Sequence, residues 1–131
     1  MNLIFFDLDG TLLNSASEIS PFTKETLVLL DEKNIAYTVA TGRTMLSAKG
    51  ILKGHDFILP QVYNNGVTIW DPKSQELTLE HLLGSQEIST VINLAISQGI
   101  TPFVHAIDDQ HYFIYHSAPC HKVEEDLINT R

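Results

Sequence analysis

Apolar and polar residues recur along the chain in patterns that predict strands and helices in turn. Residues 3–6 form a short continuous apolar run, which is typical of a strand covered on both faces of a parallel sheet. Ser20 and Pro21 predict the cap and first position of a helix, whose buried side carries Leu27 and Leu30. This order predicts an α/β fold, a Rossmann-like parallel sheet with flanking helices and right-handed crossovers. The predicted strands are residues 2–7, 35–41, 57–63, 67–70, 76–79, 101–106 and 112–116, and the predicted helices are residues 21–33, 44–52, 86–98 and 119–131.

The pattern changes near residues 82–85, where we place a boundary between two domains. Residues 1–82 hold the parallel α/β elements and a hairpin that turns at residues 71–74. Residues 83–131 begin with an amphipathic helix, followed by two strands that pair across residues 108–110. The face of that helix consists of Ile88, Val91, Ile92 and Ala95, and we expect Phe103, Tyr112 and Phe113 to form core of the same domain.

Composition narrows the class of protein. A hydrophobic fraction of 44% over 131 residues is that of a globular chain. The net charge of −8, without a cluster of Lys and Arg, predicts no binding to nucleic acid. The single cysteine, Cys120, fits a reducing compartment, and no apolar run is long enough to span a membrane. We therefore expect a cytoplasmic protein without a membrane partner.

Two carboxylates follow the first apolar run directly. Asp7 and Asp9 are two residues apart, so in an extended chain both point the same way and could face one metal ion. A carboxylate can attack phosphorus when Mg²⁺ neutralises the charges, and a second carboxylate can protonate the leaving oxygen. The alternative is a strand-end turn without a catalytic role. The apolar strand before the pair, and Gly10 and Thr11 after it, favour the chemical interpretation.

A second polar element, Thr41-Gly42-Arg43, follows the next predicted strand. A hydroxyl group and exposed backbone N–H groups at a strand-to-helix junction suit a phosphate. Simple capping of the next helix by Thr41 is the alternative. Because neighbouring parallel strands end at the same edge of a sheet, we expect this loop to lie beside Asp7, which favours phosphate binding.

These elements resemble the motifs of one enzyme family. Residues 6–13 resemble the first motif of haloacid dehalogenase-like phosphatases, and residues 40–43 resemble the second motif of their Cof-type sugar-phosphatase branch. Asn64-Asn65-Gly66, followed by an apolar strand, is similar to an element of the same branch. The resemblance implies that residues 1–82 are part of such a core and residues 83–131 part of an inserted α/β cap.

The resemblance also implies roles for individual residues. Asp7 would be the nucleophile that forms an aspartyl-phosphate and a ligand of Mg²⁺. Asp9 would be the general acid and base and would bind the metal through its backbone carbonyl. Thr41 and Gly42 would hold the transferring phosphoryl group of a sugar phosphate or similar small metabolite. The remaining matches, Arg43 and Asn65, would orient the loop or contact the substrate.

The chain departs from the family in its second half. Such enzymes use a lysine from a later loop and an acidic Gly-Asp-x-x-Asn-Asp-like motif, and neither has a match here. Lys122, the only lysine after Lys73, lies in cap-like sequence. The chain thus resembles the N-terminal half of a phosphatase, truncated, and we expect little activity from it alone and self-association through exposed core surface. A non-catalytic remnant or binding module with this fold and a phosphosugar mutase-like relative are the alternatives.

Histidines gather in the last third of the chain, near Cys120, and raise the question of a zinc site. The spacings of His105, His111, His116 and His121 match no compact set of zinc ligands. We interpret them as histidines of the surface or of a cap pocket.

Overall fold

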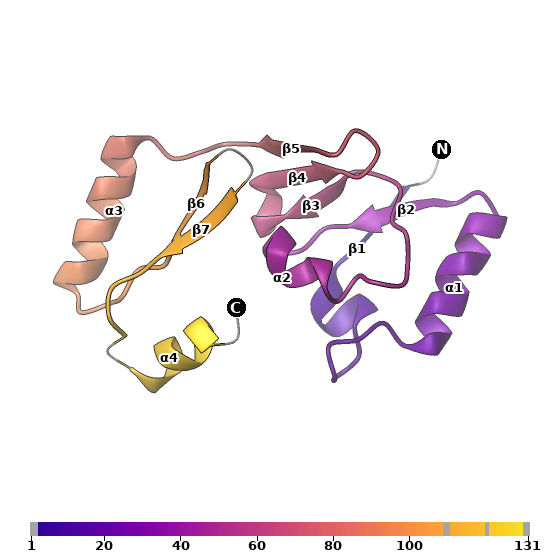
Figure 1. Ribbon diagram of the computed structural model, residues 1–131, viewed down its shortest axis with the longest axis horizontal. Helices are drawn as coiled ribbons and strands as arrows, with labels where there is room; N and C mark the ends of the chain where they lie inside the picture. Colours follow the sequence, from indigo (N-terminus) through magenta and orange to yellow (C-terminus); the bar gives the residue numbers. More distant parts are fainter. Residues whose placement is uncertain (1–2, 109–110, 120, 130–131) are drawn as a thin grey trace. The chain divides into compact units, whose positions relative to one another are not determined.

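The structure, a computed structural model, describes residues 3–108, 111–119 and 121–129. The chain divides between His81 and Leu82 into two compact units, which are described separately below (Figure 1). No helix of the described residues is both long and apolar enough to cross a membrane.

The first unit opens with a parallel β-α-β arrangement. β1 (Leu3–Phe6) pairs in parallel with β2 (Ala36–Val39), and α1 (Pro21–Glu32) connects them. Ser20 caps α1, because its hydroxyl accepts a hydrogen bond from the Thr23 N–H at 3.1 Å. The predicted α/β fold with a parallel sheet and flanking helices is therefore confirmed.

Three further strands continue this unit. α2 (Met45–Lys49) leads to β3 (Gln61–Tyr63), which forms an antiparallel sheet with β4 (Thr68–Asp71) and β5 (Glu76–Leu79). A parallel bridge between Ala40 and Val62 joins this sheet to β2. The hairpin predicted from the turn at residues 71–74 is present as β4 and β5.

The strand predicted over residues 57–63 begins only at Gln61, so its first part is wrong. Pro60 has no N–H group to donate to a neighbouring strand. The carbonyl of Pro60 instead accepts a hydrogen bond from the Thr38 hydroxyl at 2.8 Å. Phe57 is buried as part of the core without belonging to a strand.

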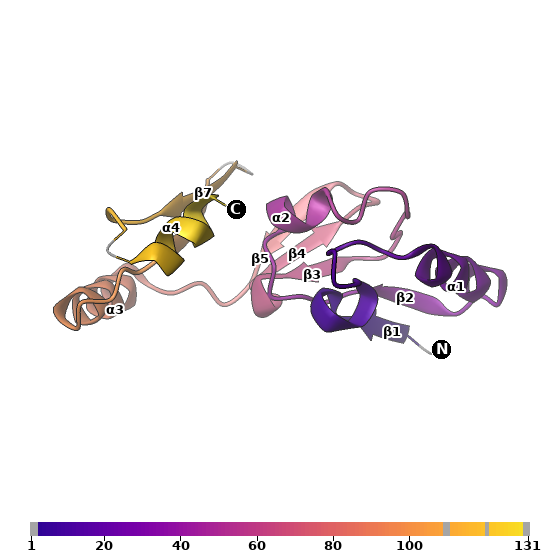
Figure 2. The same cartoon turned by 90° about the horizontal axis from the view of Figure 1, so that it is seen from below.

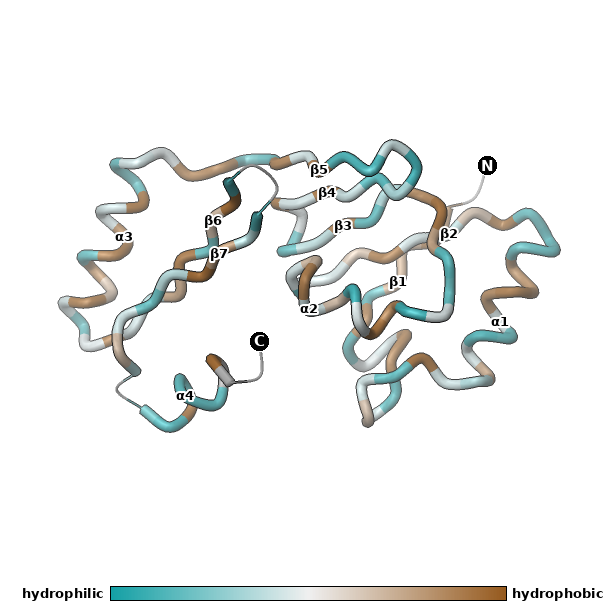
Figure 3. The backbone as a smooth tube through the Cα atoms, in the orientation of Figure 1, coloured by the Kyte–Doolittle hydropathy of each residue, from teal (hydrophilic) through white to brown (hydrophobic). Residues whose placement is uncertain are grey.

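α1 and α2 lie on the same side of the strands (Figure 2). This follows from the order β1, β2, β3, because two right-handed crossovers that advance in one direction place both helices on one face. Figure 3 shows hydrophobic and hydrophilic positions interspersed along α1, whose Leu27 is 1% exposed in the core. The buried apolar residues of this core are Leu8, Leu12, Leu13, Ile19, Leu27, Tyr37, Val39, Ala48, Leu52, Phe57 and Tyr63.

One face of β1 packs against the core and the other is exposed to solvent, which corrects the prediction that this strand is covered on both faces. Ile4 and Phe6 pack against the core, whereas Leu3 is 42% and Phe5 is 55% exposed. Among the described residues β1 pairs with β2 alone. The apolar pattern of this strand is typical of burial on both faces, but no described element supplies the second layer.

The second unit contains α3 (Ser85–Ser97), β6 (Val104–Asp108), β7 (His111–Tyr115) and α4 (Lys122–Asn129). β6 and β7 pair antiparallel, as predicted. None of the described apolar side chains of this unit is fully buried. Phe113 is 41% exposed, so its assignment to a core is wrong, and Val91 on α3 is 56% exposed.

A buried phenol in the first unit predicts a loss of stability at alkaline pH. Burial raises the pKa of Tyr63 from 10.0 to about 12. As the pH rises, the unfolded chain therefore loses this proton at lower pH than the folded chain does. The contribution of Tyr63 to the free energy of unfolding is fully present below pH 10.0 and is lost as the pH rises toward about 12. We expect a loss of about 2–3 kcal/mol across this window, measured by urea denaturation. A Tyr63→Phe variant with an equally steep decline would contradict this assignment.

Candidate active site

The chain turns sharply where β1 ends. Asp7 is extended, and its Oδ1 accepts a hydrogen bond from the Leu8 N–H at 2.8 Å, which caps a helical turn over Leu8–Leu12. Gly10 has a φ of 74°, a left-handed conformation that glycine adopts without strain. Leu8 and Leu12 are buried and anchor the turn, while the Asp7 side chain is exposed.

The turn changes how the two carboxylates are arranged. Asp7 and Asp9 both have extended backbone, with φ of −72° at each, although the turn that begins at Leu8 lies between them. The Asp9 carboxylate pairs with Arg43, with 2.7 Å from Nε to Oδ2 and 2.6 Å from Nη2 to Oδ1. This two-pronged ion pair joins the Asp7 turn to the loop after β2. Hydrogen bonding to Asp9 raises the pKa of the Arg43 guanidinium, while burial opposes the shift.

The loop after β2 is fixed by its own hydrogen bonds. The Thr41 N–H donates to the Val62 carbonyl at 3.0 Å, and the Thr41 hydroxyl accepts from the Arg43 N–H at 3.2 Å. The cap of α2 is Thr44, whose hydroxyl accepts from the Ser47 N–H. The alternative role for Thr41 as the cap of this helix is therefore wrong.

A third turn, Asn64–Gly66, lies against this loop. The Asn65 N–H donates to the Thr41 carbonyl at 3.2 Å, and the Asn64 N–H donates to the Arg43 carbonyl at 2.9 Å. Both asparagines are left-handed, with φ of 51° and 54°. The Asn65 Oδ1 lies 2.8 Å from the position that a Cβ on Gly42 would occupy. The structure thus brings Thr41, Gly42, Arg43 and Asn65 together, and Arg43 connects them to Asp9.

Asn64 belongs to the site as well, although the resemblance of the Asn64-Asn65-Gly66 turn implies a role for Asn65 alone. Besides its backbone contact with Arg43, its Nδ2 donates to the Thr68 hydroxyl at 2.9 Å, which ties the turn to β4. Two consecutive asparagines before a glycine are a signal for left-handed backbone, and this signal identifies the position.

The chemistry of the site follows from its groups. It holds an exposed carboxylate at Asp7, a guanidinium at Arg43 and exposed backbone at Gly42, beyond the carboxyl ends of β1 and β2. Crevices at this edge of an α/β sheet bind ligands. A carboxylate next to a cation and an exposed backbone suits the transfer of a phosphoryl group, whose negative charge the cation and the backbone N–H groups can stabilise.

The residues also have the oxygen donors that Mg²⁺ prefers, although few of them. Magnesium binds through one or two carboxylates and completes its shell with water and substrate phosphate. Within residues 3–108, 111–119 and 121–129, no group of three or more His, Cys, Asp or Glu gathers to hold a metal. His105 contacts Tyr112, and Cys120 lies outside the described residues.

Comparison with known proteins identifies the family. Residues 4–130 match the model of the haloacid dehalogenase-like hydrolases. The chain belongs to this family. The resemblance inferred from residues 6–13 and 40–43 is therefore confirmed.

Relatives of this haloacid dehalogenase-like chain include named phosphatases. The 5-amino-6-(5-phospho-D-ribitylamino)uracil phosphatase YwtE of Bacillus subtilis is 39% identical over 54% of this chain and 24% of its own. A second phosphatase of that name and organism, YitU, is 26% identical over 98% of this chain and 47% of its own. A haloacid dehalogenase-like hydrolase from Bacteroides thetaiotaomicron is 26% identical, with a TM-score of 0.69 over 98% of this chain and 48% of its own. The chain thus spans less than half the length of these relatives.

The close approach of Gly42 and Asn65 in this haloacid dehalogenase-like chain predicts the effect of an added methyl group. In Gly42→Ala the new Cβ displaces the Asn65 amide, which lies at the end of a movable side chain. We expect the free energy of unfolding to change by less than about 1 kcal/mol, because only a surface contact moves. The side-chain amide resonances of Asn65 should shift in an NMR spectrum, whereas those of Asn14 stay in place. Unchanged Asn65 resonances would contradict the packing described above.

Proposed function

We propose that the chain supplies the nucleophile and the phosphate-binding loops of a Mg²⁺-dependent phosphomonoester hydrolase. Its substrates would be sugar phosphates or similar small phosphorylated metabolites, in line with the phosphoribityl compound in the names of the two Bacillus relatives. The observation that carries the proposal is the Asp9–Arg43 ion pair, which holds the Asp7 turn beside the Thr41–Gly42 loop.

Asp7 and Asp9 have different roles in the two steps of the reaction, Asp7 as the nucleophile and Asp9 as the acid and then the base. An Asp7 carboxylate oxygen attacks phosphorus, the bond from phosphorus to the leaving oxygen breaks, and this oxygen takes the proton of the Asp9 carboxyl group. Asp9 then accepts a proton from water, whose oxygen attacks phosphorus, and the bond to Asp7 breaks to release phosphate. The phosphoryl oxygens rest against Thr41 and Gly42.

Arg43 links substrate binding to the state of Asp9. In the structure the guanidinium occupies both oxygens of the Asp9 carboxylate, which favours its charged form. Asp9 can act as an acid only after Arg43 has turned to another anion. A substrate phosphate is such an anion, because guanidinium groups bind phosphate and carboxylate with similar geometry.

The Asp7 carboxylate and the Asp9 backbone carbonyl would hold Mg²⁺. When bound, the ion would neutralise charge between the Asp7 carboxylate and the substrate phosphate. Further acidic ligands are absent from the described residues around the turn. We therefore propose weak binding of the metal and little turnover by the 131-residue chain.

Hydrolysis of p-nitrophenyl phosphate with Mg²⁺ tests the level of turnover. We expect slow release of nitrophenolate by the 131-residue chain. Robust release that depends on Mg²⁺ and disappears in Asp7→Asn would contradict the proposed low activity while supporting the role of Asp7. The mass in solution is measured on the same samples, so that aggregation is not mistaken for inactivity.

The solvent-exposed apolar face of β1 supports a second proposal, self-association of the chain. Phe5 is 55% exposed on β1, one edge of which pairs with no strand of the described residues, and such edges pair with other chains. We expect light scattering to report a mass above that of one chain, and Phe5→Ser to lower it. Phe22→Ser on α1, where the side chain is 78% exposed, is the matched control and should leave the mass unchanged. A monomeric wild-type chain would contradict this proposal.

A further inference from the structure

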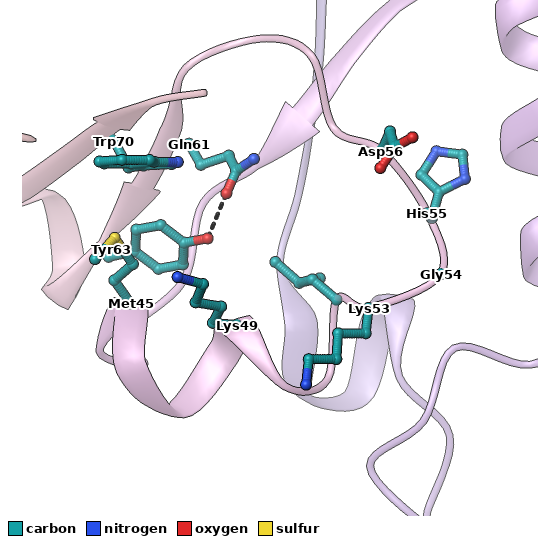
Figure 4. A pocket seen from close by; sticks show the side chains of 10 residues that line it. Met45, Lys49, Lys53, Gly54, His55, Asp56, Gln61, Tyr63 and Trp70 are labelled. Carbon is teal, nitrogen blue, oxygen red and sulfur yellow. Dashed lines mark hydrogen bonds between the residues drawn. The ribbon is translucent and has the colours of Figure 1, made fainter. Parts of the chain in front are cut away.

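A cavity of about 310 Å³ lies in the first unit, apart from the residues assigned to catalysis (Figure 4). This volume is in the range of small-molecule sites. α2 and the segment that follows it form one part of the wall, and β3 and β4 form another. The lining residues are Met45, Lys49, Leu52, Lys53, Gly54, His55, Asp56, Gln61, Tyr63 and Trp70.

The polar side chains of β3 in this cavity already have hydrogen-bond partners within the protein. The Tyr63 hydroxyl donates to Gln61 Oε1, and Gln61 Nε2 donates to the Phe57 carbonyl at 3.1 Å. Both side chains are buried, so this pair forms a fixed wall with little capacity for a polar ligand. Beside it, Met45 and Trp70 offer half-buried apolar surface. The body of a ligand is therefore expected to be apolar and, next to an indole, aromatic.

The charges around the cavity favour an anion. Lys49 and Lys53 line it, against the one carboxylate of Asp56. A third ammonium group, that of Lys24, lies 3.5 Å from the position that a Cβ on Gly54 would occupy. In Figure 4 the Lys49 side chain extends toward Tyr63 and Gln61, whereas that of Lys53 extends away from them.

His55 is engaged in the fold and is not needed for this charge. Its Nε2 lies 2.6 Å from the Tyr37 hydroxyl, and its ring packs edge-on against Phe57. The cation that faces the apolar wall is therefore Lys49. We propose that this cavity binds a small aromatic anion, with its ring against Trp70 and its anionic group on Lys49.

Two dyes that share an aromatic body test this proposal. The first, 8-anilinonaphthalene-1-sulfonate, carries a sulfonate, and N-phenyl-1-naphthylamine is its neutral counterpart. Trp70 is the only tryptophan of the chain, so energy transfer from its emission reports binding near it. We expect the anionic dye to bind about tenfold more weakly to Lys49→Gln than to the wild-type chain, the loss of one charge-assisted contact. Binding of the neutral dye should not change.

Lys73→Gln is the matched control, because it removes the same charge in the turn between β4 and β5. It should bind the anionic dye as the wild-type chain does. Equal weakening in Lys73→Gln would show a general effect of net charge and overturn the proposal. Unchanged affinity in Lys49→Gln would also overturn it, since the dye would then rest on exposed apolar surface such as that of β1. Circular dichroism of each variant shows that the fold is retained.

Discussion

Replacing Asp7 with Asn is expected to abolish transfer of a phosphoryl group from acetyl phosphate to the chain. The Asp7 side chain is exposed at the end of β1, where the turn over Leu8–Leu12 holds it in place. An amide keeps the shape of this side chain and can accept the Leu8 N–H hydrogen bond. It lacks the negative charge that makes a carboxylate oxygen a nucleophile.

Acetyl phosphate suits this experiment because its leaving group departs as acetate and needs no proton. Asp9, whose carboxylate is paired with Arg43, is then not required as an acid. The chain is incubated with the reagent and Mg²⁺, quenched in acid and weighed by mass spectrometry, which separates a phosphoryl group from acetyl groups on lysines. We expect the wild-type chain to gain one phosphoryl group.

Asp56→Asn is the matched control, since it removes the same charge from an exposed position outside the proposed active site. This variant should gain the phosphoryl group as the wild-type chain does. Equal phosphorylation of Asp7→Asn would show that another residue accepts the group and would refute the proposed role of Asp7.

Leu27→Ala should lower the free energy of unfolding by about 2–5 kcal/mol, the largest stability effect that we predict. Leu27 is 1% exposed on the face of α1 that packs against the strands, so its truncation leaves a cavity in the core of the first unit. The total free energy of unfolding of a protein is only about 5–15 kcal/mol. The variant is therefore expected to unfold at a much lower urea concentration than the wild-type chain.

Leu29→Ala on the same helix is the control for helix propensity and side-chain size. Leu29 is 47% exposed, and its truncation should cost less than about 1 kcal/mol. Urea denaturation followed by circular dichroism measures both variants. Similar losses in the two would contradict the packing of α1 described here.

Local patterns predicted much of the fold. Ser20 and Pro21 predict the start of α1, and the turn at residues 71–74 predicts the β4–β5 hairpin, because caps and turns depend on neighbouring residues. The exposure of Phe5 could not be predicted in this way. An apolar pattern shows that a side chain favours burial, but not whether another layer is present to bury it.

In the candidate site too, local motifs predict where residues lie along the chain but not which long-range contacts they make. The motifs place Asp7 and Thr41 at strand ends, and parallel pairing of β1 and β2 puts these ends at one edge. The ion pair between Asp9 and Arg43 joins residues far apart in sequence, and the choice of partner depends on the turn at Gly10. The contact therefore required the three-dimensional structure.

The central claim is that Asp7 accepts the phosphoryl group, and chemical mapping of that group tests it most directly. The chain treated with acetyl phosphate and Mg²⁺ is reduced with borohydride, which converts an aspartyl-phosphate into homoserine, and is then digested and sequenced by mass spectrometry. We predict homoserine at position 7 and aspartate at position 9. Homoserine at position 9, or none in a chain that has gained a phosphoryl group, would contradict the claim.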